Sequence, residues 1–195
     1  MYNAEITKAN IMEQAIKLFA EKGFQDTSTA DVVQAAGCSK GAFYYHFPSK
    51  DALIEETFRF CQDAIEDAAA EGIDELPNVV DKLCRRCYNL TKHALRYPDI
   101  ARVNAGYCNL PANMAKYGGG FLGCFRHYEV VMSMIEVGLA NGELKQMPAE
   151  LLGEFFAKIA TVPYSYVRKD PRYMEDEKFW AGIYDIIRCA LAEKP

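Results

Sequence analysis

Apolar residues recur along most of this chain at intervals of three and four, the spacing that places side chains on one face of an α-helix. In residues 6–22, Ile11, Leu18 and Phe19 follow this spacing, and Gly23 comes directly after the segment. We therefore expect an amphipathic helix that ends at Gly23. No stretch alternates apolar and polar residues as a half-buried strand does, so the pattern predicts an all-α fold.

Residues 27–50, TSTADVVQAAGCSKGAFYYHFPSK, predict two short helices joined by a tight turn. The Ser28 hydroxyl can cap the first helix, and Gly37 permits the left-handed backbone that ends it. Ser39 can cap a second helix, which we expect over residues 40–47. Two helices joined in this way form a helix-turn-helix, whose second helix enters the major groove of DNA.

The second helix of this pair combines an apolar side with basic and aromatic side chains. Phe43 and Phe47 are four residues apart and should face inward. Lys40 lies at the end of the helix that approaches base edges, and Gly41 lets the backbone come close. A plain three-helix core with exposed tyrosines is the alternative. The predicted DNA-contacting residues are Ser28, Thr29, Ser39, Lys40, Gly41, Tyr44, Tyr45, His46 and Lys50.

Two segments, LFAEKGFQDTS and AAGCSKGAFYYHFPSKDAL, resemble the DNA-binding domain of the TetR/AcrR family of bacterial transcriptional regulators. The family's Tyr-x-His-Phe signature stands here at residues 44–47. Three positions depart from the family pattern. Ala30 replaces a frequent base-reading arginine, which leaves out a second base-specific contact, whereas Val33 and Cys38 replace alanine and valine as packing variants.

The resemblance implies a helix-turn-helix DNA-binding domain over residues 1–48 and a helical ligand-binding and dimerisation domain over residues 49–195. It implies about nine helices, with the last two packing against a second copy in a homodimer. The implied partners are a double-stranded DNA operator and a small-molecule inducer.

The hydrophobic pattern of the remainder fits this helical body. Further helices are expected over residues 49–72, 74–97, 99–106, 121–141, 148–168 and 176–193. Pro163 should kink its helix or end it early. Between residues 99 and 120 the pattern becomes irregular, and Gly118, Gly119 and Gly120 follow one another, which favours a mobile gate.

The charge distribution is compatible with a DNA-binding head. The net charge is -5, but five lysines balance five acidic residues over residues 1–50, so the acidic excess belongs to the body. Because this head carries no arginine, we expect modest phosphate anchoring and a binding site that needs two heads. The absence of a long apolar run or a signal-peptide core predicts a cytoplasmic protein. Its seven cysteines are expected to be reduced.

Several body residues have two or more interpretations. The motif Cys84-x-x-Cys87 suits core packing, thiol sensing or metal binding, although no second ligand pair completes a metal site. His93 and His127 suit ligand contacts or ordinary packing. The large side chains suit a core or the lining of an inducer pocket. The predicted ligand-binding residues are Cys84, Tyr88, Cys108, Phe121, Phe125, Tyr128, Phe155 and Ile159.

The sequence thus favours a ligand-responsive homodimeric repressor that needs no cofactor or metal. A regulator switched by cysteine oxidation is one alternative. An enzyme or carrier on the same helical scaffold is another, although no nucleophile elbow, glycine-rich phosphate loop or metal-spaced cluster supports it.

Overall fold

The computed structural model describes residues 4–110, 113 and 125–193. This part contains nine α-helices and one short 3-10 helix, and its only β-type pairing is an isolated bridge between Leu144 and Ala192. The predicted all-α fold is confirmed. The elements are α1 (Ala4–Asp26), α2 (Thr29–Ala36), α3 (Lys40–His46), α4 (Lys50–Ala70), α5 (Val79–Arg96), α6 (Pro98–Cys108), α8 (Phe125–Ala140), α9 (Ala149–Val167), η1 (Pro171–Glu175) and α10 (Glu177–Leu191).

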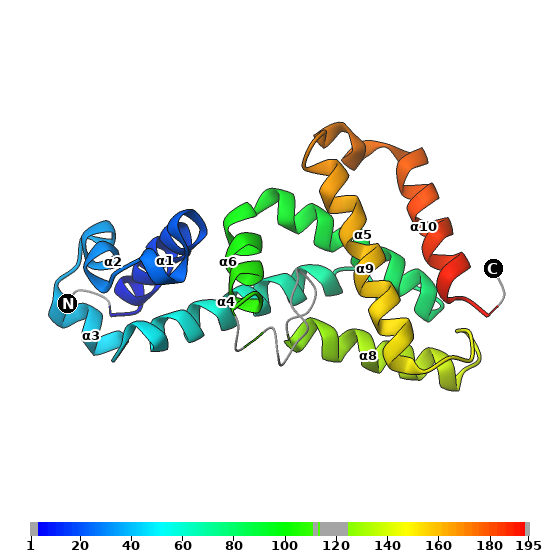
Figure 1. Ribbon diagram of the computed structural model, residues 1–195, viewed down its shortest axis with the longest axis horizontal. Helices are drawn as coiled ribbons and strands as arrows, with labels where there is room; N and C mark the ends of the chain where they lie inside the picture. Colours follow the sequence, from blue (N-terminus) through cyan, green and yellow to red (C-terminus); the bar gives the residue numbers. More distant parts are fainter. Residues whose placement is uncertain (1–3, 111–112, 114–124, 194–195) are drawn as a thin grey trace.

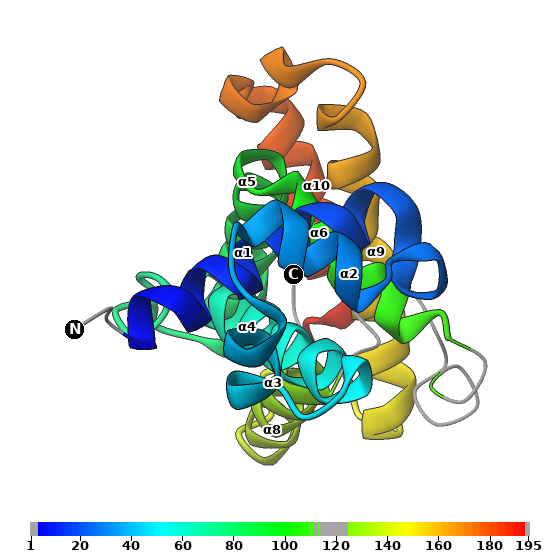
Figure 2. The same cartoon turned by 90° about the vertical axis from the view of Figure 1, so that its left-hand side faces the viewer.

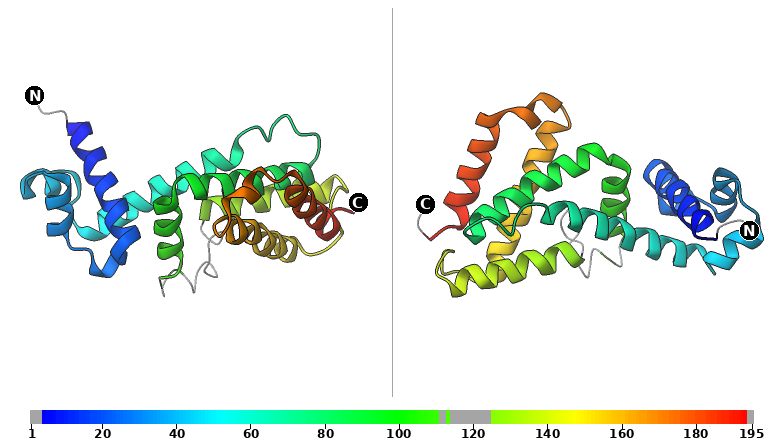
Figure 3. Two further views of the ribbon diagram at one scale, coloured as in Figure 1. Left: turned by 90° about the horizontal axis from the view of Figure 1, so that it is seen from above. Right: turned by 180° about the vertical axis from the view of Figure 1, so that it is seen from behind.

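The molecule is elongated, with α1, α2 and α3 at one end and the remaining helices towards the other (Figure 1). Helix α4 runs from the small N-terminal group into the larger one, as the views from above and behind show (Figure 3). Figure 2, seen from the N-terminal end, places α1 and α2 in front of α6 and the body helices. We call α1–α3 the head and α5–α10 the body, and α4 connects them.

Two hydrophobic clusters hold these parts together. The body cluster joins α4, α5, α8, α9 and α10 around side chains such as Leu83, Ile135 and Phe156. The head cluster contains Phe43 and Phe47, and it extends into Leu53 of α4 and Val103 of α6. Helix α1 also packs directly against α6. The head is therefore packed on the body as well as on itself, and a boundary at residue 48 stays a prediction.

Helix boundaries depart from the sequence predictions in α5 and in α1, whereas α9 keeps its predicted extent. Helix α5 begins at Val79 instead of residue 74, because the Asn78 side chain accepts a hydrogen bond from the backbone N–H of Asp81 at 2.8 Å and caps the helix there. Helix α9 continues to Val167, so Pro163 does not end it early. The helical segment of α1 resumes beyond Gly23, whose φ of 82° interrupts it, and reaches Asp26.

Candidate nucleic-acid interface and effector site

The caps predicted for α2 are present. The Ser28 hydroxyl accepts from the backbone N–H of Asp31 at 3.1 Å, and the Asp31 carboxylate accepts from the backbone N–H of Ser28 at 2.8 Å. Hydrogen bonds from the Ser28 side chain and backbone lower the pKa of the Asp31 carboxyl. Gly37, with a φ of 60°, ends the helix in the left-handed conformation. Local sequence thus fixes the first half of the helix-turn-helix.

Helix α3 follows after a three-residue turn and is fixed on its apolar side. The Ser39 hydroxyl accepts from the backbone N–H of Ala42 at 3.1 Å and caps the helix. Phe43 and Phe47 are fully buried, as predicted. Tyr44 and Tyr45 point away from this core, and Tyr45 is 79% exposed. The helix therefore presents an open face on a rigid base.

Polar contacts that the sequence did not reveal hold the head in place. The Asn10 side-chain amide donates to the backbone carbonyl of Ala36 at 2.6 Å and joins α1 to the end of α2. The buried Thr27 hydroxyl donates to the carbonyl of Gly23 at 2.8 Å. Lys8 pairs with Glu56 of α4. These polar residues fall outside the apolar stripe, so hydrophobic spacing gave no signal for them.

None of the nine predicted DNA-contacting residues is buried. Lys50 is the most constrained of the predicted cations, because its ammonium donates to the backbone carbonyl of Gln25 at 3.1 Å. This contact ties the start of α4 to the segment before α2. The other predicted cation, Lys40, is exposed in the first turn of α3. Contact of these residues with DNA stays a prediction.

Comparison with known proteins identifies the head. The family model "Bacterial regulatory proteins, tetR family" matches residues 11–57. This segment belongs to the TetR family. The chain is 32% identical to the transcriptional regulator AcrR of Shigella flexneri over 74 residues, which are 38% of this chain and 34% of that protein. It is 35% identical to IcaR of Staphylococcus aureus, a negative transcriptional regulator of a biofilm operon, over 31% of this chain and 32% of IcaR.

The chain as a whole resembles known proteins in its structure. A candidate TetR-family transcription regulator from Shewanella sp. PV-4 has a TM-score of 0.81 at 22% identity, over 96% of this chain and 99% of that one. A TetR-family transcription regulator from Marinobacter aquaeolei VT8 has a TM-score of 0.77 at 20% identity, over the full length of both. These likenesses show that the fold is shared along the chain. The chain spans only about a third or less of the curated relatives it matches.

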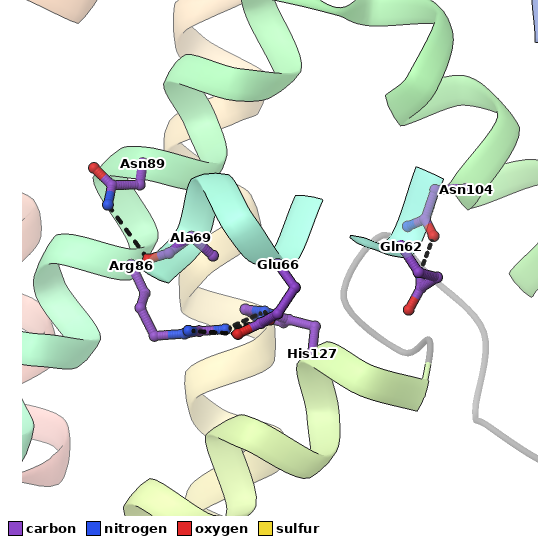
Figure 4. Close-up of polar contacts among 7 residues, drawn as sticks. All are labelled: Gln62, Glu66, Ala69, Arg86, Asn89, Asn104 and His127. Carbon is purple, nitrogen blue, oxygen red and sulfur yellow. Dashed lines mark hydrogen bonds and ion pairs between the residues drawn. The ribbon is translucent and has the colours of Figure 1, made fainter. Parts of the chain in front are cut away.

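The body and α4 bury three polar side chains that contact one another (Figure 4). We call Glu66, Arg86 and His127 the polar cluster. The Arg86 guanidinium donates two parallel hydrogen bonds to the Glu66 carboxylate, at 3.0 and 2.7 Å. Arg86 Nη2 also lies 2.7 Å from His127 Nδ1. The three side chains come from α4, α5 and α8, so the polar cluster joins the connecting helix to the body.

These contacts determine which ring nitrogen of His127 carries the proton. Arg86 can only donate, so at 2.7 Å His127 Nδ1 must accept, and the proton of the neutral ring lies on Nε2. The longer 3.4 Å contact between Nδ1 and Glu66 is secondary. Burial, reinforced by the charge of Arg86, lowers the pKa of His127 and keeps it neutral. No group in the described part of the chain accepts from the buried Nε2.

Glu66 remains ionised in this setting. Burial by itself would raise its pKa, but the hydrogen bonds and charge of Arg86 outweigh burial and lower the pKa of the Glu66 carboxyl. About one turn before Glu66 on α4, the Gln62 amide donates to Asn104 of α6 (Figure 4). The carbonyl oxygen of Gln62 is buried and has no donor among the described residues. The body therefore buries both a donor and an acceptor that a polar molecule can satisfy.

The predicted ligand-binding residues occupy several different places. Tyr128 lines a cavity of about 10 Å³ together with His127. Cys84 and Tyr88 pack in the body cluster, where Tyr88 meets the ring of Trp180 at 4.8 Å. Ile159 packs against the same cluster. Phe155 is 50% exposed on the outer side of α9.

The remaining predicted ligand-binding residues are Cys108, Phe121 and Phe125. Cys108 is fully buried beside Phe58. Phe121 and the side chain of Phe125 lie outside the described residues, as do residues 111–112 and 114–120 of the predicted gate. The described members of the predicted set therefore lie at different positions in the body, and their role in ligand binding stays a prediction.

Three buried cysteines lack the environment of a reactive thiol. Burial raises the pKa of the Cys84 and Cys61 thiols to about 12 in each case. Burial also raises the pKa of Cys87. Such thiols are protonated at neutral pH and react slowly. Cys108 is disulfide-bonded, which departs from the expectation of reduced thiols throughout.

The described residues lack two further kinds of feature. No group of three or more histidine, cysteine or acidic side chains is placed to hold a metal ion there. Among the described helices, none is both long enough and apolar enough to cross a membrane.

Proposed function

We propose that this protein is a DNA-binding transcriptional repressor that acts as a homodimer and releases its operator when a small molecule binds in the body. The observation that carries this proposal is the open face of α3, presented on a capped and buried base within a TetR-family head. A helix held in this way can enter the major groove while its neighbours contact phosphates. The name of IcaR, a negative regulator, favours repression.

An exposed apolar stripe on α9 supports the homodimer. Its members are Leu151, Phe155, Val162 and Tyr166. They lie four, seven and four residues apart, so they share one face of the helix. Ile186 adds a further exposed apolar side chain on α10. Four large apolar side chains in one row are costly in water unless another surface covers them. We call this row of side chains the α9 stripe.

The polar cluster supports a small-molecule effector. His127 Nε2 and the Gln62 carbonyl are buried polar groups that a ligand would satisfy, and unsatisfied groups of this kind cost about 1 to 3 kcal/mol each. Glu66 and Gln62 both lie on α4, whose other end joins the head. A ligand that moves these side chains would therefore act on the helix that positions the head. We accordingly place the effector beside this cluster.

Selection of genomic fragments by the purified full-length protein tests this function. We expect enrichment of an inverted repeat upstream of a small number of genes, and a gel shift that Tyr44→Ala and Lys40→Ala weaken. Thr161→Ala on α9 is the matched control and should bind like the parent. Recovery of random fragments, or retention of binding by both head variants, would contradict the proposal.

A further inference from the structure

A groove of about 500 Å³ lies where the head meets the body, away from the polar cluster. Its walls come from α1 of the head, α4, and the corner between α5 and α6, and α1 and α6 lie side by side there (Figure 1). The apolar side chains Met12, Ile16 and Ile100 line it. Phe60 and Tyr97 also line it and are 48% and 43% exposed. Large aromatic side chains thus remain open to solvent in a hollow.

The charges around this groove are unevenly paired. Lys17 pairs with Glu13 at 2.7 Å within α1, and Asp99 pairs with Arg102 at 2.9 Å within α6. Arg96 also lines the groove, but no carboxylate pairs with it among the described residues. Its guanidinium lies over the ring of Tyr97, 5.4 Å from the ring centre. Among the described residues, Arg96 is therefore the groove's cation without an acidic partner.

We propose that this groove binds a small amphiphile with one acidic group, whose apolar part lies against Phe60 and Ile16 and whose acid pairs with Arg96. Two observations carry the proposal. The volume falls within the roughly 300 to 1,000 Å³ of small-molecule pockets, and the lining is mostly apolar with a few polar groups at the edge. A planar guanidinium also matches a carboxylate with two parallel hydrogen bonds.

The position of the groove gives this binding a consequence. A molecule lodged between α1 and the corner of α5 and α6 contacts head and body at once, so it favours the head orientation that completes the groove. If the head binds DNA, as proposed above, this ligand and DNA change each other's affinity by the same factor. Binding in the groove does not itself depend on the proposed function.

Methyl NMR on the full-length protein tests the groove with decanoate as the probe and decan-1-ol as its uncharged counterpart. We expect saturable shifts of the Met12, Ile16 and Ile100 methyl signals, while Ile135 in the body cluster stays unchanged. Decan-1-ol should bind more weakly, because it lacks the charge that pairs with Arg96.

Three variants separate recognition of the acidic group from recognition of the apolar part of the probe. Arg96→Gln should weaken decanoate about ten-fold, the effect of losing one charge-assisted pair, and leave decan-1-ol unchanged. Lys92→Gln removes a cation of α5 that is exposed and does not line the groove, and it should leave both probes unchanged. Phe60→Gln should weaken both probes, because it removes part of the apolar wall.

Several outcomes would overturn this inference. Shifts that appear only in the body would place the binding elsewhere, and equal affinities of the parent and Arg96→Gln would remove the acidic group from the proposal. Methyl shifts that grow with protein concentration without a probe would show that a second copy fills the groove. A probe that binds as expected in a protein without operator binding would leave the groove intact and contradict only the proposed function.

Discussion

At the scale of single residues, the polar cluster carries a cost of burial. Three polar side chains leave water, and their mutual contacts must compensate for the lost hydration. Arg86 is fully buried, and its two hydrogen bonds to Glu66 provide most of this compensation. His127 accepts from the same guanidinium and stays neutral. Each member therefore depends on the presence of the others.

Removing one partner of the ion pair should cost more than removing both. Arg86→Met leaves the Glu66 carboxylate buried without its cation, so we expect a loss of about 3 to 5 kcal/mol in the free energy of unfolding. The double variant Arg86→Met with Glu66→Leu should lose clearly less than the sum of the single variants. Urea unfolding of all three measures this, and additive losses would show that the pair is not coupled.

The stability of the protein should decrease as the pH falls. The pKa of His127 is lowered in the fold from its ordinary 6.5, so the unfolded chain takes up a proton first as the pH falls below about 6.5, and stability declines from there. The pKa of Glu66 is lowered from 4.5, so a second decline begins below about 4.5. Urea midpoints between pH 8 and 3 measure both.

A matched pair of variants isolates the contribution of His127. Burial also lowers the pKa of His93, which therefore contributes in the same direction. His127→Gln and His93→Gln should each remove part of the decline below about pH 6.5, and the double variant should remove more than either. An unchanged profile in the double variant would assign the decline to other groups.

At the scale of elements, α3 is held by residues close to it in sequence. Ser39 caps it, and Phe43 and Phe47 anchor it. Its exposed side chains can therefore differ in role without changing the position of the helix. Lys40 is free to reach a base, whereas Lys50 is attached to the carbonyl of Gln25 at the start of α4.

The two lysines should contribute differently to DNA binding. We expect Lys40→Ala to cost about 1 to 3 kcal/mol at the cognate site and to relax the preference for one base. Lys50→Ala should weaken binding to all sequences alike. It should also reduce the slope of the logarithm of the binding constant against the logarithm of salt concentration by about one. Titrations at several salt concentrations, with cognate and scrambled duplexes, measure both effects. If Lys40→Ala weakened binding to the cognate and scrambled duplexes equally, Lys40 would contact only phosphate.

Two helical glycines test how tightly the body elements pack. A Cβ at Gly138 of α8 would lie 2.8 Å from the Leu144 side chain and 3.2 Å from that of Val79, so Gly138→Ala should destabilise the protein by about 1 to 3 kcal/mol. A Cβ at Gly182 of α10 would meet nothing within 4 Å. Gly182→Ala should therefore be neutral or stabilise by up to about 1 kcal/mol. Thermal unfolding compares the two, and equal shifts would show that α8 has room to adjust.

At the scale of the whole molecule, the arrangement of head and body sets the requirements for operator binding. The head lies at one end of an elongated chain, and the apolar α9 stripe lies in the body. If two copies pair through this stripe, one two-fold axis relates both heads. Half-sites on DNA should then be separated by one helical turn or a multiple, about 34 to 36 Å per turn.

Charges placed in the α9 stripe should separate the two copies and abolish operator binding. Phe155→Glu with Val162→Glu puts two carboxylates into the proposed interface, so we expect a monomer that retains its helical content. Sedimentation velocity and a gel shift measure the two effects. Glu154→Gln with Lys158→Gln, on the same helix, is the matched control. A double-glutamate variant that remains dimeric would place the interface elsewhere.

The sequence by itself determined the helical class, the tight turn and the recognition helix, because the caps at Ser28 and Ser39, the left-handed Gly37 and the Phe43–Phe47 spacing all act within a few residues. Only tertiary structure brought together Glu66, Arg86 and His127, whose partners lie 20 and 61 residues from Glu66. It also formed the groove between head and body. Helical spacing shows which face of a helix is buried, but it does not specify which polar residues meet across packed helices.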